Sequence, residues 1–229
     1  MLTLHVNGQP LVSLMCTPVQ QEELALGFLF NEHLVESLAD VKVLELCGGG
    51  QCVDVWLTHD IEPPRLRTIT SGCTGGTTFA DVAQTQHRVH STLRLAPALV
   101  TRLMEELARS AKIYHRSGGI HTAALTAGER LLHVVEDVGR HNALDKLAGL
   151  CLRAGDDMRD RVLLTTGRIS SEMVSKIARM EVPIAISRTS PTSLAVRLAQ
   201  EWHITLIGYT RRRSFRVYTH PERIVAGES

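Results

Sequence analysis

The most informative part of the chain is residues 162–209, which read VLLTTGRISSEMVSKIARMEVPIAISRTSPTSLAVRLAQEWHITLIGY. This part holds three short apolar runs, Val162–Thr166, Pro183–Ser187 and Ile204–Tyr209, and successive runs begin 21 residues apart. The segments between the runs repeat their apolar residues at helical spacing. This alternation predicts a β-α-β-α-β unit whose strands are parallel and joined by right-handed crossovers. Because the runs are almost wholly apolar, we expect both faces of the sheet to be covered.

The flanking residues extend this unit into a domain over residues 96–229. Pro97 is placed to open a helix, because proline is tolerated in the first helical turn. Ile120–Leu125 and Leu131–Glu136 are expected to be strands, and a further helix is expected from about Gly139. The fold class predicted for this domain is α/β with a central, largely parallel sheet.

The first 62 residues predict a small, separate α+β domain. Asn7-Gly8 lies between two runs of alternating apolar and polar residues, which is typical of a β-hairpin. Thr17 is expected to be a helix N-cap, with Gln20 completing a capping box. The elements expected here are a hairpin over 1–15, a helix from Thr17 to about His33, and strands over Val41–Leu46 and Cys52–Leu57.

Composition and charge narrow the class of protein. The 229 residues include 25 Lys+Arg against 24 Asp+Glu, and 44% are hydrophobic, which is typical of a globular protein. A net charge of +1 and an aromatic content of 4% argue against a nucleic-acid partner. We expect no membrane association, because no apolar run approaches the roughly 18 residues of a span and the start lacks signal-peptide character. Five cysteines form no recognisable disulfide framework, so we expect a cytoplasmic protein.

Arginine and hydroxyl side chains follow each of the three predicted parallel strands. Ligands collect at this edge of a parallel sheet, and helix N-termini and arginine forks both favour phosphate. The three loops together therefore predict a phosphate or nucleotide site, although in any single loop a capping hydroxyl and a solvated arginine are the simpler interpretation. The candidate residues are Thr166, Arg168, Ser187, Arg188, Thr189, Tyr209, Thr210, Arg211, Arg212, Arg213 and Ser214.

A dense polar segment, Glu136–Asn142, lies where a predicted strand passes into the next helix. Asp137 could cap that helix. Arg140 and His141 fall in its first turn, and we expect them to face the same edge of the sheet. His141 could there bind a phosphate or shuttle a proton.

Residues 63–95 are expected to be a linker that carries one Gly-rich loop with Cys73. Successive backbone N–H groups in such a loop could stabilise a thiolate or a persulfide. The alternative is an inert surface thiol.

Of the other four cysteines, two are interpreted as structural, and the roles of Cys47 and Cys52 are left unassigned. Cys16 and Cys151 lie in apolar patterns and are expected in the core. Cys47 and Cys52 flank a hairpin and could approach each other, but most such pairs are simply strand residues. The chain has no CxxC pair and no zinc-like histidine spacing, so we expect no metal site and no permanently bound metal.

Several long motifs resemble the formate dehydrogenase accessory sulfurtransferases, the FdhD family. The motifs are Gly118–Ala124, Glu136–Lys146, Thr192–Val196, and the ending from Gly208-Tyr209 through Val217–Pro221. The resemblance implies a cytidine-deaminase-like three-layer fold with an N-terminal α+β extension, usually as a homodimer. It also implies transfer of sulfur from a cysteine desulfurase to a molybdenum (or tungsten) cofactor before that cofactor enters formate dehydrogenase. The form implied is molybdenum bis(molybdopterin guanine dinucleotide), bound as a client.

The same resemblance assigns roles to individual residues. Cys73 matches the loop cysteine that carries persulfide in the family, and Tyr209–Ser214 matches the family's cofactor-binding stretch. Many members carry a CxxC in this loop, whereas here Cys73 is followed by Thr74-Gly75-Gly76. A persulfide relay needs only one nucleophile, so transfer stays possible. Phosphate neutralisation is expected from Arg140, Arg168, Arg188 and Arg211–Arg213, with help from His141.

Other functions are also considered. A chaperone that holds the cofactor without carrying sulfur would fit the single loop cysteine. A regulator that binds RNA or nucleotides is disfavoured by the neutral charge and the few aromatic residues. Deamination is not expected, because zinc deaminases need an H-x-E and a P-C-x-x-C. The matching helix starts offer Arg140-His141 and Ser170-Ser171-Glu172, with no cysteine.

Overall fold

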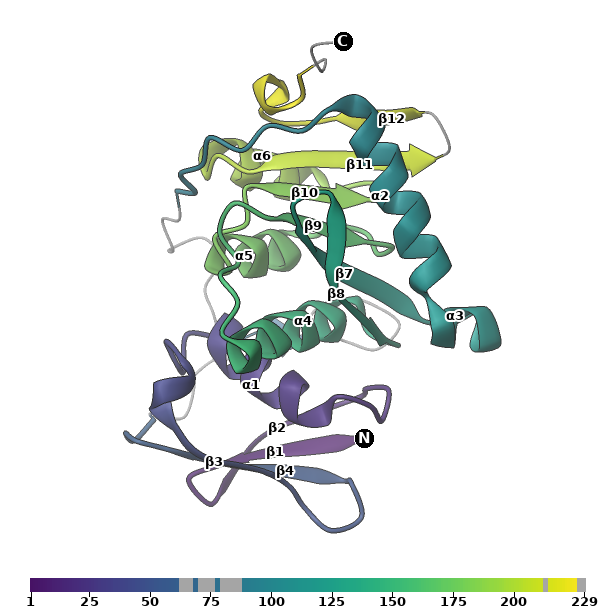
Figure 1. Ribbon diagram of the computed structural model, residues 1–229. Coiled ribbons are helices and arrows are strands. Elements are labelled where there is room, and N and C mark those ends of the chain that lie inside the picture. Colours follow the sequence, from purple (N-terminus) through teal and green to yellow (C-terminus); the bar gives the residue numbers. More distant parts are fainter. Residues whose placement is uncertain (62–67, 70–76, 79–87, 212–213, 226–229) are drawn as a thin grey trace. The chain divides into compact units, whose positions relative to one another are not determined.

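The structure is a computed structural model that describes residues 1–61, 88–211 and 214–225, together with the backbone of 68–69 and 77–78 (Figure 1). The chain divides into two compact units. The first comprises Met1–Asp81 and Asp137–Asp156, and the second comprises Val82–Glu136 and Asp157–Ser229. Three residues to which the sequence assigned functions lie outside the described part, namely Cys73, Arg212 and Arg213.

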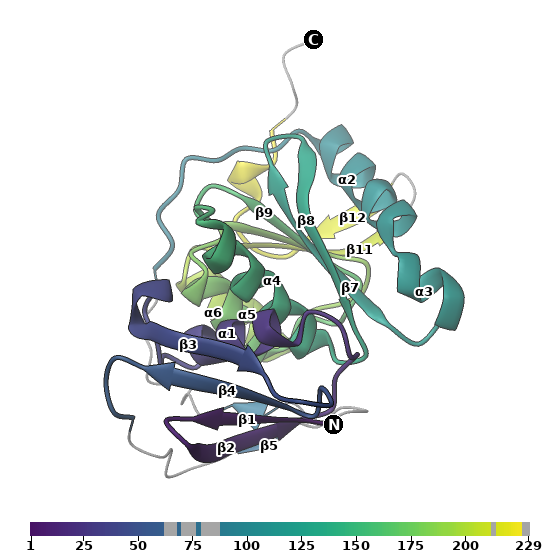
Figure 2. The same cartoon turned by 60° about the horizontal axis from the view of Figure 1, so that its bottom comes forward.

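The first unit is built on a four-stranded sheet in the order β2-β1-β4-β3 (Figure 2). Its strands are β1 (Leu2–Val6), β2 (Gln9–Leu14), β3 (Val41–Leu46) and β4 (Cys52–Leu57). Both predicted hairpins are confirmed, and Asn7 and Gly8 adopt the positive φ angles that their turn requires. β1 also pairs with β4 in parallel, which joins the two hairpins into one sheet. A separate short pair joins β5 (Thr68–Ile69) to β6 (Thr77–Thr78).

Helix α1 (Gln21–Asn31) packs along α4 (Arg140–Ala154), and the two backbones meet closely. A Cβ atom on Gly27 would lie 1.7 Å from the carbonyl oxygen of Asp145, and one on Gly149 would lie 2.0 Å from that of Glu23. Glycine at both positions is therefore what lets the helices approach. A short 3-10 helix, η1 (Leu38–Asp40), leads from this pair into β3.

The prediction that Thr17 caps α1 is wrong. The N-cap is Gln20, which has a φ of 53° and makes no side-chain capping bond. The Thr17 hydroxyl instead accepts a hydrogen bond of 3.0 Å from the backbone N–H of Val138, and its own N–H donates to Asp137. A contact with a segment 120 residues away thus overrides a local capping pattern.

Asp137 and Lys146 form an ion pair in which neither side chain is exposed, with 2.7 Å between Oδ2 and Nζ. The Asp137 carboxylate also accepts hydrogen bonds from the Gly139 N–H and the Asn142 amide, at 2.8 and 2.9 Å. The N-cap of α4 is Gly139 and has no side-chain capping bond. Asp137 therefore holds the turn before the helix rather than capping the helix itself.

The two units differ from the domains expected over 1–62, 63–95 and 96–229. The difference is α4, which the sequence placed in the C-terminal domain and the structure places in the first unit. Leu144, Leu147 and Cys151 of this helix are fully buried. The helical spacing of such residues predicts an apolar face but does not say which element covers it.

The second unit contains a six-stranded sheet in the order β12-β11-β10-β9-β7-β8. The predicted β-α-β-α-β unit is confirmed, because β9, β10 and β11 are neighbours and parallel. Its elements are β9 (Val162–Thr165), α5 (Ser171–Arg179), β10 (Ile184–Ser187), α6 (Ser193–Glu201) and β11 (Thr205–Arg211). Every residue of β9 and β10 is buried, as expected for strands covered on both faces.

Antiparallel strands extend this sheet on both sides. β7 (His121–Ala127) pairs antiparallel with β9, β8 (Arg130–Asp137) lies beyond it, and β12 (Ser214–Val217) pairs antiparallel with β11. The sheet is therefore parallel only in its centre, whereas the sequence predicted a largely parallel sheet. The connections β7–β8 and β11–β12 are too short for the crossover that parallel pairing needs.

Helices cover both faces of this sheet, with α2 (Pro97–Ser110) on one face and α5 and α6 on the other (Figures 1 and 2). Val100, Leu103 and Leu107 of α2 pack against apolar residues of the central strands. Two short helices, α3 (Lys112–Ser117) and η2 (Pro221–Arg223), complete the unit. The α/β fold class is confirmed, and the likeness to cytidine deaminases stays a prediction. The described part of the chain has no helix that could cross a membrane.

Candidate ligand-binding site at the strand ends

A cavity of about 450 Å³ lies at the carboxyl ends of the central strands in the second unit. Thr166 follows β9, Arg188 follows β10, and Thr210 and Arg211 end β11, and all four line the cavity. The sequence predicted these four residues, because parallel strands bring the loops that follow them to one edge. The structure therefore brings together part of each of the three predicted loops.

Two buried threonines contribute hydroxyl groups to the cavity, and these could form hydrogen bonds to a ligand. The hydroxyl oxygens of Thr122 and Thr210 are buried and have no hydrogen-bond partner among the described residues. A buried polar group without a partner costs free energy, so a ligand that bonds to it gains that free energy back. Thr166 differs, because its hydroxyl already accepts a hydrogen bond of 3.0 Å from the Thr122 N–H.

The charged side chains that line the cavity are mostly positive. Arg188 and Arg211 are exposed, and within the described part of the chain neither forms a salt bridge. Both guanidinium groups could therefore turn toward a ligand. Glu105 is the one carboxylate among the lining residues that the structure describes. Guanidinium forks together with hydroxyls suit a phosphate or a carboxylate ligand.

The loop after β10 is held in place by its own hydroxyl groups. The Ser187 hydroxyl donates to the carbonyl oxygen of Gly167 at 2.7 Å and accepts from the Thr189 N–H at 3.0 Å. The Thr189 carbonyl then accepts from the Tyr209 N–H at 3.0 Å. A Cβ atom on Gly208 would lie 2.7 Å from that same carbonyl, so only glycine allows this approach. Ser187 and Thr189 therefore position the loop that carries Arg188.

A second hollow, of about 580 Å³, lies beside β12 and is lined by Tyr209, Arg211, Ser214, Phe215 and Arg216. Tyr209 has a φ of 51°, and its exposed ring lies 5.3 Å from the Arg216 guanidinium carbon. This cation–π contact holds an aromatic face at the surface. Arg211 lines both hollows, so the two are adjacent.

Helix α3 brings Tyr114 and His115 to the first cavity. The backbone N–H groups of Ile113 and Tyr114 both donate to the Glu136 carboxylate, at 2.8 Å each. The first N–H groups of a helix have no partner within it and favour a negative charge. Glu136, in the polar segment that the sequence singled out, thus anchors one wall of the cavity.

Comparison with known proteins agrees with this fold. A family model described as the FdhD/NarQ family matches residues 1–225. This chain belongs to the FdhD/NarQ family. The FdhD/NarQ relatives include the sulfur carrier protein FdhD of Bacillus subtilis, which is 40% identical over 97% of this chain and 87% of its own length. The sulfur carrier protein FdhD of Staphylococcus haemolyticus is 37% identical over 99% of this chain and 88% of its own.

A solved structure supports the FdhD/NarQ assignment at the level of the fold. The crystal structure of a formate dehydrogenase accessory protein from Desulfotalea psychrophila is 29% identical and superposes with a TM-score of 0.81. The match covers 97% of this chain and 87% of the Desulfotalea psychrophila chain. The fold described above is therefore shared with that accessory protein.

The remaining predicted site residues of this FdhD/NarQ chain lie elsewhere. Arg168 is exposed and lines neither hollow. Arg140 and His141 belong to the first unit, where α4 begins at Arg140 as predicted and His141 is buried. Their expected position at the edge of the sheet stays a prediction. Arg212, Arg213 and Cys73 lie outside the described residues.

Sequence reasoning missed the wall of the cavity that α2 and α3 form. It used α2 only as a core helix, yet Thr101, Glu105 and Ala108 of α2 line the cavity. Their spacing of four and then three residues places them on one stripe of the helix, beside the stripe that faces the core. Small and polar residues beside an apolar stripe were the available signal, but solvent-exposed stripes look the same.

Two cysteines of this FdhD/NarQ chain are poorly suited to nucleophilic chemistry. Burial, and then the negative charge of Asp137, raise the pKa of the Cys16 thiol above its ordinary value of 9.0. Cys151 is fully buried in α4. Since the thiolate is the reactive form, neither residue fits the role of a sulfur carrier at neutral pH.

Proposed function

We propose that this chain is a sulfur carrier that serves formate dehydrogenase and that Cys73 carries the sulfur. The names of the relatives, sulfur carrier protein FdhD, support the carrier role. The accessory-protein structure supports the link to formate dehydrogenase. Cys16 and Cys151 fit the carrier role poorly, and this favours Cys73.

The proposed transfer is a displacement at sulfur. The Cys73 thiolate attacks the terminal sulfur of a persulfide on a cysteine desulfurase, and the desulfurase cysteine leaves as a thiolate. The S–S bond of the Cys73 persulfide then breaks, Cys73 keeps the electron pair and returns to a thiolate, and the terminal sulfur passes to the client cofactor at the oxidation level of sulfane sulfur. One nucleophile suffices for both steps, so the missing second cysteine of the loop does not prevent them.

The client in this proposal is molybdenum (or tungsten) bis(molybdopterin guanine dinucleotide), bound through a nucleotide part at the strand ends. The observation that carries this step is that one cavity is lined by Arg188, Arg211 and two threonines, Thr122 and Thr210, whose buried hydroxyls have no hydrogen-bond partner among the described residues. Two guanidinium groups can neutralise a phosphate, and the hydroxyls can donate to its oxygens. A volume of about 450 Å³ is within the usual range of small-molecule sites. The exposed face of Tyr209 offers a stacking surface beside it.

The carrier step is tested by intact-protein mass spectrometry after incubation with cysteine and a cysteine desulfurase. We expect added sulfur on the wild-type chain and on Cys16→Ser, none on Cys73→Ser, and loss of the added mass on reduction. If Cys73→Ser keeps the added sulfur, Cys73 is not the carrier. If wild type gains none while it still binds nucleotide, the chain is a chaperone that holds the cofactor without carrying sulfur.

The binding step is tested by titrating the chain with guanosine diphosphate, followed by calorimetry. Arg211→Ala and Arg188→Ala are each expected to weaken binding by roughly 10-fold or more, since a hydrogen bond to a charged group contributes about 1.5–3 kcal/mol. Arg197→Ala is the matched control, because it removes an exposed arginine of α6 outside the cavity. If all three variants bind guanosine diphosphate with equal affinity, the nucleotide does not bind at the strand ends.

The donor, the assembly and the compartment belong to the same proposal. We expect a cysteine desulfurase as sulfur donor, a homodimer as the assembly and the cytoplasm as the compartment. The desulfurase is tested by the mass-spectrometry experiment above, because omitting it must remove the added sulfur.

A further inference from the structure

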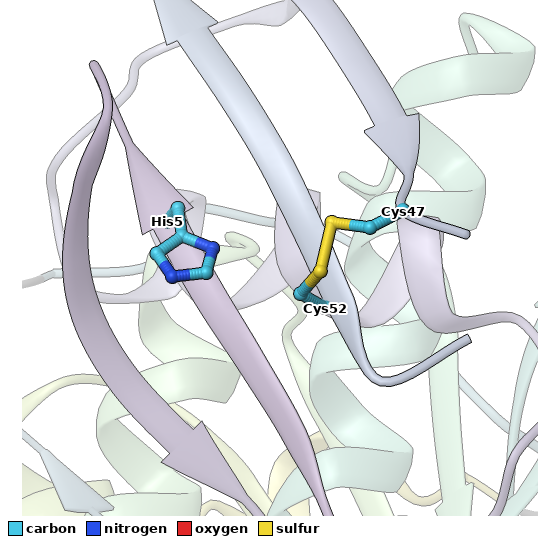
Figure 3. Close-up of side chains that lie close together, drawn as sticks. All are labelled: His5, Cys47 and Cys52. Atoms are coloured by element: carbon cyan, nitrogen blue, oxygen red, sulfur yellow. A yellow bond between two sulfur atoms is a disulfide. The ribbon is translucent and has the colours of Figure 1, made fainter. Parts of the chain in front are cut away.

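Three side chains that can bind a metal meet on the first unit. The Nδ1 or Nε2 atom of His5 and the sulfur atoms of Cys47 and Cys52 all lie within 4.8 Å of one another. Figure 3 shows His5 on β1 and the two cysteines at the facing ends of β3 and β4. This cluster plays no part in the proposed sulfur transfer.

Strand pairing explains why these residues meet. β1 and β4 are parallel, with Thr3 opposite Cys52 and His5 opposite Asp54. Because side chains alternate between the faces of a strand, Cys52 and Asp54 share the face opposite to the buried Val53. The backbone bond from the Cys47 N–H to the Cys52 carbonyl, 2.9 Å, sets the two cysteines opposite each other.

Asp54 lies between the histidine and the first cysteine. Its Oδ1 atom is 3.2 Å from Nδ1 of His5, and its Oδ2 atom is 3.4 Å from the sulfur of Cys47. The neighbouring residue across the β3–β4 pair is Glu45, which adds a second negative charge near this face. The side chains of His5 and Asp54 are 30% and 50% exposed, so an ion could reach them from solvent.

We propose that the reduced chain binds one zinc ion through Cys47, Cys52 and His5, with Asp54 as the fourth ligand. In the structure the two cysteines are joined by a disulfide, which is the form without metal. Two thiols of the glutathione type reduce this disulfide to two cysteine thiols and are themselves oxidised to a disulfide. Zinc binding then displaces one proton from each thiol, and the two thiolates share the metal.

The donor set matches zinc better than the hard cations. Two sulfur ligands, one imidazole and one carboxylate are all groups that zinc takes in tetrahedral sites, whereas calcium and magnesium prefer oxygen alone. The four residues between Cys47 and Cys52 fit the C-x₂₋₄-C spacing of such sites. Two thiolates and a carboxylate would also repel one another, and a divalent cation removes that repulsion.

Sequence reasoning expected no metal site here for a definite reason. His5 lies 42 residues before Cys47, so no spacing rule connects it to the cysteines. Only the parallel pairing of β1 with β4 brings it to them. The glycines between the cysteines, Gly49 and Gly50, take positive φ angles and form the tight turn that sets Cys47 against Cys52.

The test uses the full chain, reduced and stripped of metal with a chelator, and titrated with zinc or with cobalt(II) as a spectroscopic substitute. We expect one equivalent of metal to bind, with a sulfur-to-cobalt charge-transfer band. The double variant Cys47→Ser/Cys52→Ser is expected to bind none. His5→Ala is expected to weaken binding by more than about 10-fold, since even partners outside the ligand set contribute 10–100-fold. Cys16→Ser and Cys73→Ser are the controls, and each should bind one equivalent of metal as the wild-type chain does.

Several results would overturn the proposal. They are a reduced wild-type chain that binds no metal, metal binding that survives in the double variant, and metal binding that is lost in Cys73→Ser. The oxidised chain should bind no zinc, because both sulfurs are held in the disulfide. Failure here leaves the sulfur-carrier proposal untouched, since that proposal depends on Cys73 and the strand ends.

Discussion

Two buried threonines on β11, Thr205 and Thr210, differ in whether their hydroxyl groups have hydrogen-bond partners. The Thr210 hydroxyl has no partner among the described residues, whereas the Thr205 hydroxyl donates to the carbonyl of His220 at 3.1 Å. The Thr205 hydroxyl also lies 3.2 Å from the Arg223 guanidinium, which donates to it. Buried polar groups are nearly always bonded, so the Thr210 hydroxyl, like that of Thr122, is an exception that ligand binding would explain.

Thr210→Val is therefore expected to leave the melting temperature unchanged or raise it, because valine fills the same space and removes a buried hydroxyl that has no partner in the described part of the chain. The same change should weaken binding of guanosine diphosphate by roughly 10-fold or more, since a hydrogen bond to a charged phosphate oxygen contributes about 1.5–3 kcal/mol. Thr205→Val is the matched control and should lower the melting temperature. Both quantities come from thermal unfolding with and without nucleotide, and an unchanged affinity in Thr210→Val would contradict the role given to this hydroxyl.

The raised pKa of Cys16 predicts a pH profile for its alkylation. The pKa rises because burial, and then Asp137, disfavour the thiolate. We expect the rate of alkylation by iodoacetamide, followed by peptide mass spectrometry, to reach its midpoint above pH 9.0 in the folded chain. In urea, where the burial is lost, the midpoint should fall toward the ordinary value. A midpoint below pH 9.0 in the folded chain would mean that Cys16 is as reactive as an exposed thiol.

At the scale of elements, the contact between α1 and α4 depends on two glycines. The Cβ atom of an alanine at Gly27 or Gly149 would overlap backbone atoms, which cannot move aside as a flexible side chain can. Alanine would otherwise favour the helix by about 1 kcal/mol. The direction of the measured effect thus separates helix propensity from packing.

Gly27→Ala and Gly149→Ala are each expected to destabilise the chain by about 3 kcal/mol or more, the upper end of what overpacking costs. Gly119→Ala is the control, because a Cβ atom there would meet nothing within 4 Å. It should change stability by less than about 0.5 kcal/mol. Urea unfolding measures all three, and a neutral or stabilising Gly27→Ala would show that the helices are farther apart than described.

Elements also show where local patterns mislead. Thr17, Pro18 and Gln20 form a good capping pattern, yet α1 begins at Gln21 and Thr17 bonds to residues before α4. The strands were predicted more accurately, because an apolar run or a two-residue alternation is a property of consecutive residues. The partner of each strand was predictable only where a short connection or a repeated crossover determines it.

At the scale of the whole molecule, the buried pair of Asp137 and Lys146 binds the segment around Thr17, which lies 120 residues before Asp137. Lys146 also donates from Nζ to the carbonyl oxygen of Thr17 at 3.1 Å, and the Asn142 amide donates to that of Met15 at 2.8 Å. The segment before α1 and the start of α4 are thus joined through buried charges and carbonyls.

Lys146→Met is expected to destabilise the chain by about 3–5 kcal/mol, because it leaves the Asp137 carboxylate buried and unpaired. The double variant Asp137→Asn/Lys146→Met should lose less than the sum of the two single changes. Arg153→Ala is the control, because it breaks the partly exposed pairs with Glu22 and Glu23 and should cost about 0–1 kcal/mol. Chemical unfolding of the four variants gives the coupling, and strict additivity would mean that the pair is not formed in solution.

Part of the candidate site could be predicted from the order of residues along the chain. Thr166, Arg188, Thr210 and Arg211 all line the cavity because each ends or follows a parallel strand, and the strands themselves are visible as apolar runs. The wall formed by α2 and α3 could not be predicted. It depends on which stripe of α2 faces the sheet and on the bonds from α3 to Glu136.

Residue order alone determined the features that arise between near neighbours: the hairpins, the parallel unit with its two crossovers, and the edge at which arginines and hydroxyls gather. Only the tertiary structure decided that α4 packs on α1 through two glycines, that β1 lies beside β4, and that His5 meets Cys47 and Cys52. The physical reason is that periodicity and connection length act along the chain, whereas packing and strand register depend on residues that meet across it.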